Sequence, residues 1–102
     1  MSRLRVAVEA ETDMSEILDA LETKASPAVA ARYAERFRQA VERLVEMPRN
    51  GASKPALGPH ARRVVVPPYI LIYDYTSGDD MVTLLRVLHG RRRITAEMRQ
   101  RG

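Results

Sequence analysis

Hydrophobic and polar residues alternate at the beginning of the chain. Between residues 3 and 9, Leu4, Val6 and Val8 fall on one side of an extended segment, and most charged side chains fall on the other. A period of two residues predicts a β-strand with one buried face. From residue 12 onward the apolar period changes to three or four residues, which is the spacing of a helix with one apolar face. The pattern therefore predicts a strand followed by helices.

Two helices are predicted before Pro48. The first is expected to begin at Thr12 or Asp13, since both side chains can cap a helix N-terminus. Its apolar positions are Met14, Ile17, Leu18 and Leu21. The second begins at Ser26 and Pro27, with serine as the cap and proline in the first turn. Its apolar positions are Val29, Tyr33, Phe37, Ala40, Val41, Leu44 and Met47. The link between them is only a few residues long, which predicts an antiparallel helical hairpin.

The second half of the chain is predicted to be rich in strands. Proline and glycine punctuate a loop over residues 49–61, and a turn is expected at residues 77–80. The predicted strands cover residues 62–66, 69–75 and 81–89. The element order is then β-α-α-β-β-β, an α+β fold with an antiparallel-rich sheet and the helical hairpin packed on one face. The other face is expected to be free for a partner or substrate.

Composition limits the class of protein. A length of 102 residues with 45% hydrophobic residues fits one globular domain over residues 1–102. The chain has no cysteine, and its two histidines, His60 and His89, cannot build a structural metal site by themselves. The longest run of apolar residues and prolines, Val64 to Tyr73, is about half of what a membrane-spanning helix needs. We therefore expect a protein of the reducing cytoplasm that uses no cofactor, no metal and no membrane.

Charge is unevenly distributed. Residues 1–50 carry eight basic and nine acidic side chains, whereas residues 51–102 carry nine basic and four acidic ones. Of the 17 basic residues only Lys24 and Lys54 are lysines. Arginine binds carboxylate and phosphate groups through a planar fork of donors. The basic second half therefore indicates an anionic partner, either nucleic acid or an acidic protein segment, with a merely solvated surface as the alternative.

Several local motifs resemble one family of bacterial proteins. The strongest is Arg-Val-Leu-His-Gly-Arg-Arg at residues 86–92. The segments ETDMSEILDAL and ERLVEMPRNG agree with it, as do the single positions Leu57, Gly58, Arg63, Tyr69 and Tyr73. Over nearly its whole length the chain resembles the ParE/RelE superfamily of toxins from toxin–antitoxin pairs, and ParE more than RelE. The resemblance implies either inhibition of DNA gyrase, as in ParE-like members, or ribosome-dependent mRNA cleavage, as in RelE-like members.

The residues needed for RNA cleavage are incomplete. Attack by the 2′-hydroxyl requires a base, an acid and cations near the phosphate. The candidates here are Arg63, Arg86 and His89, and RelE-like toxins are similar in adding a tyrosine or another acid–base group near the C-terminus. No tyrosine follows His89, and arginine stays protonated. We therefore predict a gyrase inhibitor without catalytic residues; an mRNA endonuclease, or an inactive antitoxin-binding module, is the alternative.

Contacts with the target are expected at the basic end of the last strand. The predicted residues are Arg86, His89, Arg91, Arg92 and Arg93. Two of them have structural alternatives, because Arg86 could pair with a carboxylate such as Asp74, and His89 could be a hydrogen-bonded residue at a strand end. The run of three arginines could likewise be a solvated tail.

The resemblance also implies a ParD-like antitoxin as partner. Its C-terminal segment is expected to fold onto this chain, because a disordered segment that folds on binding can cover much of a small protein. Tyr33, Phe37 and Tyr73 are the predicted contacts, although core packing is the alternative for Tyr73. Operator DNA is expected to be bound only indirectly, through the antitoxin.

Overall fold

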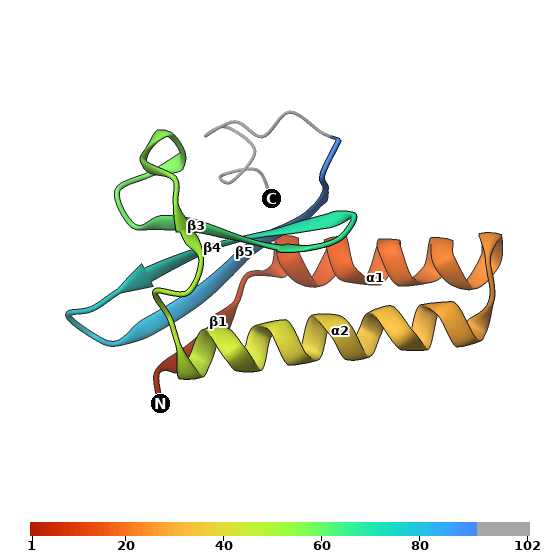
Figure 1. Cartoon of the computed structure of the whole chain (residues 1–102), viewed down its shortest axis with the longest axis horizontal. Coiled ribbons are helices and arrows are strands. Elements are labelled where there is room, and N and C mark those ends of the chain that lie inside the picture. The colour runs from red at the N-terminus through yellow and green to blue at the C-terminus, as the bar shows by residue number, and fades with distance from the viewer. Residues whose placement is uncertain (92–102) are drawn as a thin grey trace.

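The computed structural model describes residues 1–91, and within them two helices pack against one face of a five-stranded sheet (Figure 1). In chain order the elements are β1 (Arg3–Val6), α1 (Val8–Lys24), α2 (Pro27–Glu46), β2 (Ala52–Ser53), the 3₁₀ turn η1 (Pro55–Leu57), β3 (Ala61–Val66), β4 (Tyr69–Thr76) and β5 (Met81–His89). No helix within residues 1–91 is long and apolar enough to cross a membrane.

The strands lie in the order β1-β5-β4-β3-β2. β1 runs parallel to β5, and every other neighbouring pair is antiparallel. The helical hairpin returns the chain to the start of β1, where the Ser2 N–H donates a hydrogen bond to the Val45 carbonyl at 3.0 Å. Because β3, β4 and β5 then alternate in direction, β5 runs parallel to β1. The predicted α+β fold, with an antiparallel-rich sheet and the hairpin on one face, is therefore confirmed (Figure 1).

The main core lies between the helices and the sheet. Its buried residues come from both helices and from β4 and β5: Ala10, Phe37, Leu44, Tyr69, Leu71, Tyr73, Val82, Leu84 and Val87. Burying such large apolar side chains provides most of the stabilisation of a domain of this size. The aromatic rings of Tyr33, Phe37 and Tyr69 contact one another, with Phe37 and Tyr69 centroids 5.5 Å apart.

The opposite face of the sheet is partly covered. Leu57 of η1 packs against a smaller buried cluster formed with Ala61, Ile70 and Ile72. The sequence predicted a plain loop over residues 49–61, whereas this segment folds back over the sheet through β2 and η1. Part of the face that was expected to be free is therefore a second, small core.

Helix α2 begins as predicted and α1 does not. The Ser26 hydroxyl accepts a hydrogen bond from the backbone N–H of Val29 at 3.1 Å, with Pro27 in the first turn. Helix α1 begins four residues before Thr12, at Val8, and no side chain caps it. Asp13 thus lies inside the helix, where its carboxylate is available for a contact with the sheet.

Strand β5 contains an irregularity that the alternation of its residues did not predict. The pairing with β4 shifts between Ile72 and Tyr73, so that Ile72 lies opposite Arg86 and Tyr73 opposite Leu84. One extra residue, Leu85, is accommodated at this bulge, and the side-chain alternation changes there. Val87 consequently joins the main core instead of facing away from it.

Candidate interaction site at the end of strand β5

The second half of β5 has an edge that β1 does not cover. β1 pairs only with the first four residues of β5, from Met81 to Leu84. After β1 the chain turns into α1, and the Ala7 N–H donates the last hydrogen bond of this side to the Leu84 carbonyl at 2.9 Å. An uncovered strand edge exposes backbone groups that need partners. In this protein a side chain of α1 supplies one of them.

Asp13 joins α1 to this edge. Its Oδ2 accepts hydrogen bonds from the Val87 N–H at 2.9 Å and from Arg86 Nε at 2.7 Å, and its Oδ1 accepts one from Arg86 Nη2 at 3.0 Å. The Arg86 and Asp13 side chains are only 13% and 11% exposed. The hydrogen bond from Arg86 to Asp13 raises the pKa of the arginine above its ordinary value. Arg86 is therefore a charged group held in place by a carboxylate, as a structural ion pair would be.

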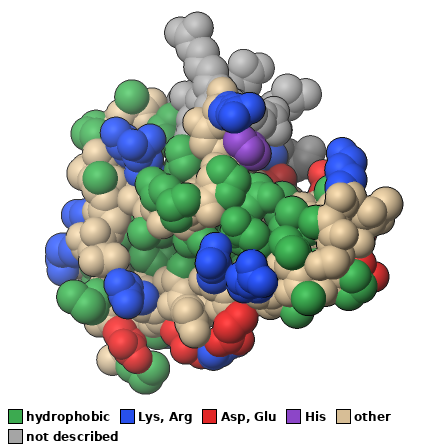
Figure 2. All heavy atoms as spheres, turned by 45° about the vertical axis from the view of Figure 1, so that its right-hand side comes forward, with side chains coloured by type: hydrophobic (Ala, Val, Ile, Leu, Met, Phe, Trp, Pro, Cys, Tyr) green, Lys and Arg blue, Asp and Glu red, His purple; other side chains and the backbone are tan. Residues whose placement is uncertain are grey.

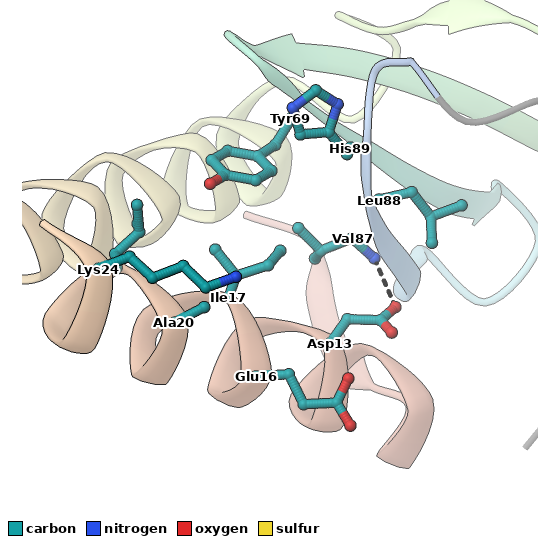
Figure 3. A pocket seen from close by; sticks show the side chains of 10 residues that line it. Asp13, Glu16, Ile17, Ala20, Lys24, Tyr69, Val87, Leu88 and His89 are labelled. Atoms are coloured by element: carbon teal, nitrogen blue, oxygen red, sulfur yellow. Dashed lines mark hydrogen bonds between the residues drawn. The ribbon is translucent and has the colours of Figure 1, made fainter.

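A groove runs between α1 and the end of β5. It has a volume of about 390 Å³, an apolar floor, and charged or polar groups at its border (Figure 3). Its lining residues are Asp13, Glu16, Ile17, Ala20, Leu21, Lys24, Tyr69, Val87, Leu88 and His89. The two carboxylates lie near one end of the groove, where the Asp13 side chain meets the Val87 N–H (Figure 3).

His89 is held at the end of the strand by two contacts. Its ring meets the Tyr69 ring edge-on, with centroids 5.7 Å apart, and its Nδ1 accepts a hydrogen bond from the Arg91 N–H at 3.1 Å. In a neutral ring with this hydrogen bond, the proton is carried by Nε2. Burial, followed by the nearby Tyr33, raises the pKa of Tyr69, so this tyrosine is a poor base at neutral pH. This geometry matches the structural alternative that the sequence left open for His89, a hydrogen-bonded histidine at the end of a strand.

The structure does not gather the three candidate catalytic residues in one place. Arg63 on β3 and Arg86 on β5 are both register partners of Ile72, which belongs to the small core on the face away from the helices. His89 is the register partner of Tyr69, which belongs to the main core on the helix side. Arg86 turns to Asp13 on α1. Arg63 and His89 therefore belong to opposite faces of the sheet.

The other predicted contact residues differ in their surroundings. Tyr73 is fully buried; its hydroxyl accepts a hydrogen bond from the Gly51 N–H at 2.9 Å and donates one to the Pro48 carbonyl at 2.8 Å. Burial is the main cause of its raised pKa. Tyr73 therefore packs in the core, which was the alternative to an antitoxin contact, and its buried side chain offers no surface for an antitoxin.

Tyr33 and Phe37 lie on α2. Tyr33 is half-buried and carries the Arg36 guanidinium over its ring at 5.0 Å, whereas Phe37 is 2% exposed.

Among the predicted target contacts, Arg91 is exposed, and Arg92 and Arg93 lie outside the described residues. Asp13 could not be recognised from the sequence as a member of the site, because its partners are 73 and 74 residues away in the chain.

Comparisons with known proteins identify the family and the fold. The family model of the ParE toxin of type II toxin–antitoxin systems, parDE, matches residues 4–94. Among solved structures, the chromosomal ParDE toxin–antitoxin system of P. aeruginosa is similar with a TM-score of 0.72 and 20% identity, covering 87% of this chain and 96% of that one. No curated protein matches significantly.

Two structures of RelE-type toxins have the same fold. The isolated RelE toxin of E. coli aligns with a TM-score of 0.62 and 18% identity, covering 91% of this chain and 88% of that one. The RelBE2 complex of Mycobacterium tuberculosis aligns with a TM-score of 0.54 and 19% identity, covering 86% of this chain and 96% of that one. These likenesses are at the level of the fold. The family match spans most of the sequence, and the chain belongs to the ParE toxins of type II toxin–antitoxin systems.

Proposed function

We propose that this toxin acts in the cytoplasm by binding DNA gyrase directly, without hydrolytic chemistry of its own, and that a ParD-like antitoxin neutralises it. The observation that carries the proposal is the separation of the candidate catalytic groups. Asp13 engages Arg86, and His89 belongs to the opposite face of the sheet from Arg63. RNA cleavage requires the acid–base group and the cations near the phosphate to reach the same substrate. This arrangement supports binding over RNA cleavage.

The proposed target surface is the end of β5. It includes His89, the exposed Arg91 and, further along the sequence, Arg92 and Arg93. Arg86 contributes by holding the strand end against α1 through Asp13. Figure 2 shows a face on which hydrophobic side chains gather, with arginine or lysine groups and a histidine around them. An apolar centre with a charged border fits a protein partner that carries acidic side chains.

The proposed antitoxin surface is a second groove, between α1 and α2 beside β1. Its volume is about 390 Å³ and its lining is mostly apolar, including Leu4, Met14, Leu18, Phe37 and Val41. Leu4 is 43% exposed. Such a groove fits the apolar face of an amphipathic helix. The antitoxin would then also be the part of the complex that contacts operator DNA.

The test compares two activities of the same antitoxin-free protein. One assay measures gyrase supercoiling and trapped cleaved DNA, and the other measures mRNA cleavage on translating ribosomes. We expect gyrase inhibition that disappears on addition of antitoxin, with the mRNA intact. Cleaved mRNA with unaffected gyrase would contradict the proposal and favour the RelE-like activity. If the protein neither inhibits gyrase nor cleaves mRNA, the proposal is also contradicted, and an inactive antitoxin-binding module is favoured.

A further inference from the structure

A second basic site lies at the other end of the sheet, away from the end of β5. The loop before β3 and the turn between β4 and β5 lie at this end, next to the C-terminal end of α2 (Figure 1). They enclose a polar hollow of about 180 Å³, lined by Arg49, Ser53, Pro59, His60, Ala61, Arg62, Tyr75 and Ser77. We propose that this hollow, called here the Arg49–Arg62 hollow, binds a phosphate group of a nucleotide or of a nucleic acid strand. The proposal does not depend on which cellular target the toxin has.

Arg62 is fixed in the hollow by backbone carbonyl groups. Its Nη1 donates hydrogen bonds to the Gly51 carbonyl at 2.8 Å and to the Arg49 carbonyl at 3.2 Å. Neither acceptor carries a charge, so the guanidinium is positioned without being neutralised. Its Nε and Nη2 groups have no hydrogen-bond partner within residues 1–91. A preorganised guanidinium with unused donors is suited to an oxyanion.

Arg49 supplies a second positive charge from the end of α2. Its guanidinium lies over the ring of Tyr75, 5.1 Å from the centroid. A cation–π contact positions arginine but leaves its edge donors available. No ion pair of Arg49 with a carboxylate occurs within the described part of the chain.

The remaining lining groups are also of the kind that bind an oxyanion. The hydroxyls of Ser53 and Ser77 have no hydrogen-bond partner within residues 1–91, and His60 is exposed. No aspartate or glutamate of the described residues lines the hollow. Of the nearby acidic residues of the β4–β5 turn, Asp79 accepts a hydrogen bond from Thr76, and Asp80 accepts hydrogen bonds from Ser2 and from Tyr75 at the edge of the hollow.

The number and arrangement of these groups favour phosphate over carboxylate. One planar fork pairs well with one carboxylate. Here two guanidinium groups, two hydroxyls and an imidazole come from separate segments of the chain. Donors that converge from several directions suit the tetrahedral set of oxygens on a phosphate group. The site is small, so it would accept the phosphate and leave the rest of the ligand outside.

The test uses the full-length, antitoxin-free toxin and nuclear magnetic resonance of its backbone amides. The probes are inorganic phosphate, deoxyadenosine monophosphate and a short single-stranded deoxyoligonucleotide. We expect chemical-shift changes centred on Ser53, Ser77 and residues 60–62 with each probe. Arg49→Gln should weaken binding about tenfold, because one charge-assisted hydrogen bond is lost. The matched control Arg32→Gln, on the exposed face of α2, should leave binding unchanged.

Two outcomes distinguish the source of the phosphate. If the source is a nucleic acid strand, the oligonucleotide binds more tightly than the mononucleotide. Arg49→Gln then reduces the magnitude of the negative slope of log affinity against log salt by about 0.7. If the source is a free nucleotide, the oligonucleotide gains nothing over the mononucleotide. Absence of shifts at this hollow with all three probes would overturn the proposal. Equal losses in Arg49→Gln and Arg32→Gln would overturn it too, because they would indicate diffuse attraction to a basic surface.

Discussion

The two ends of the sheet use arginine in different ways. At the end of β5, Arg86 is paired with the carboxylate of Asp13, so the pair carries no net charge. At the opposite end, Arg62 is held by two neutral carbonyl groups and Arg49 by an aromatic ring. An arginine-rich half of the chain therefore does not locate an anion site by itself. What matters is whether the group that positions each arginine also neutralises it.

The two arrangements should also differ in their effect on stability. Removing one partner of a little-exposed ion pair leaves an unpaired charge, which is costly. Removing an arginine that only contacts carbonyl groups and solvent leaves groups that water can reach.

Replacing Asp13 should have the largest effect. In Asp13→Ala, Arg86 and the Val87 N–H lose the hydrogen bonds that they donate to this carboxylate, and we expect a loss of about 3 kcal/mol in the free energy of unfolding. Urea denaturation measures it. The control is Asp19→Ala, which removes an exposed carboxylate from the same helix and should cost little. Equal losses in the two variants would show that the pair does not hold the end of β5.

Replacing Tyr73 should have the next largest effect, on the loop that forms one wall of the Arg49–Arg62 hollow. Tyr73→Phe leaves the Gly51 N–H and the Pro48 carbonyl without their partner and should cost about 1–2 kcal/mol. The control Tyr75→Phe loses an exposed hydrogen bond to Asp80 and should cost less. Denaturation curves of the two variants that coincide would contradict the role of Tyr73 as an anchor.

Gly51 shows how close this contact is. A Cβ atom added there would lie 2.6 Å from the Tyr73 hydroxyl and 2.6 Å from the Arg63 carbonyl. Both neighbours are fixed, one by burial and the other by the sheet. Gly51→Ala should therefore displace the start of β2 and lower the thermal denaturation midpoint, whereas Gly78→Ala, with open space around it, should be tolerated.

The smallest effect is expected from the acidic turn beside the hollow. The hydrogen bond from Thr76 lowers the pKa of Asp79, and that from Ser2 lowers the pKa of Asp80, relative to the ordinary value of 3.8. A carboxyl whose pKa is lowered by folding stabilises the folded state above its unfolded pKa, and this contribution is lost as pH falls through the folded value. Thermal denaturation between pH 7 and pH 2 should therefore show a shallower acid-side decline in Asp79→Asn than in the unmodified chain. An unchanged profile would contradict the role of this carboxyl.

Much of the fold could be predicted from the sequence because it is encoded locally. The limits of β5, the Ser26 cap and the helical hairpin all follow from periodicity and from capping residues close together in the chain. The start of α1 could not be predicted, because no side chain caps it. The bulge in β5 could not be predicted, because a bulge depends on the pairing of two strands.

The candidate site was less predictable than the fold. His89 and Arg86 were identified from their place in the C-terminal motif. The Asp13–Arg86 pair depends on how α1 crosses the edge of β5, which no spacing in the sequence contains. His60 has no role predicted from the sequence, and it lines the Arg49–Arg62 hollow only because the loop folds back against the β4–β5 turn.

The most direct test of a toxin that binds its target without cutting RNA compares Arg63→Gln with Arg91→Glu. Both residues are basic, but Arg63 belongs to the alternative catalytic set and Arg91 to the proposed target surface. Trapping of cleaved DNA by gyrase, measured for both variants, should be unchanged in Arg63→Gln and strongly reduced in Arg91→Glu. The account would be contradicted if Arg63→Gln lost the trapping of cleaved DNA while Arg91→Glu kept it. The alternative catalytic set would then be needed for toxin activity, and mRNA cleavage would again be the function to test.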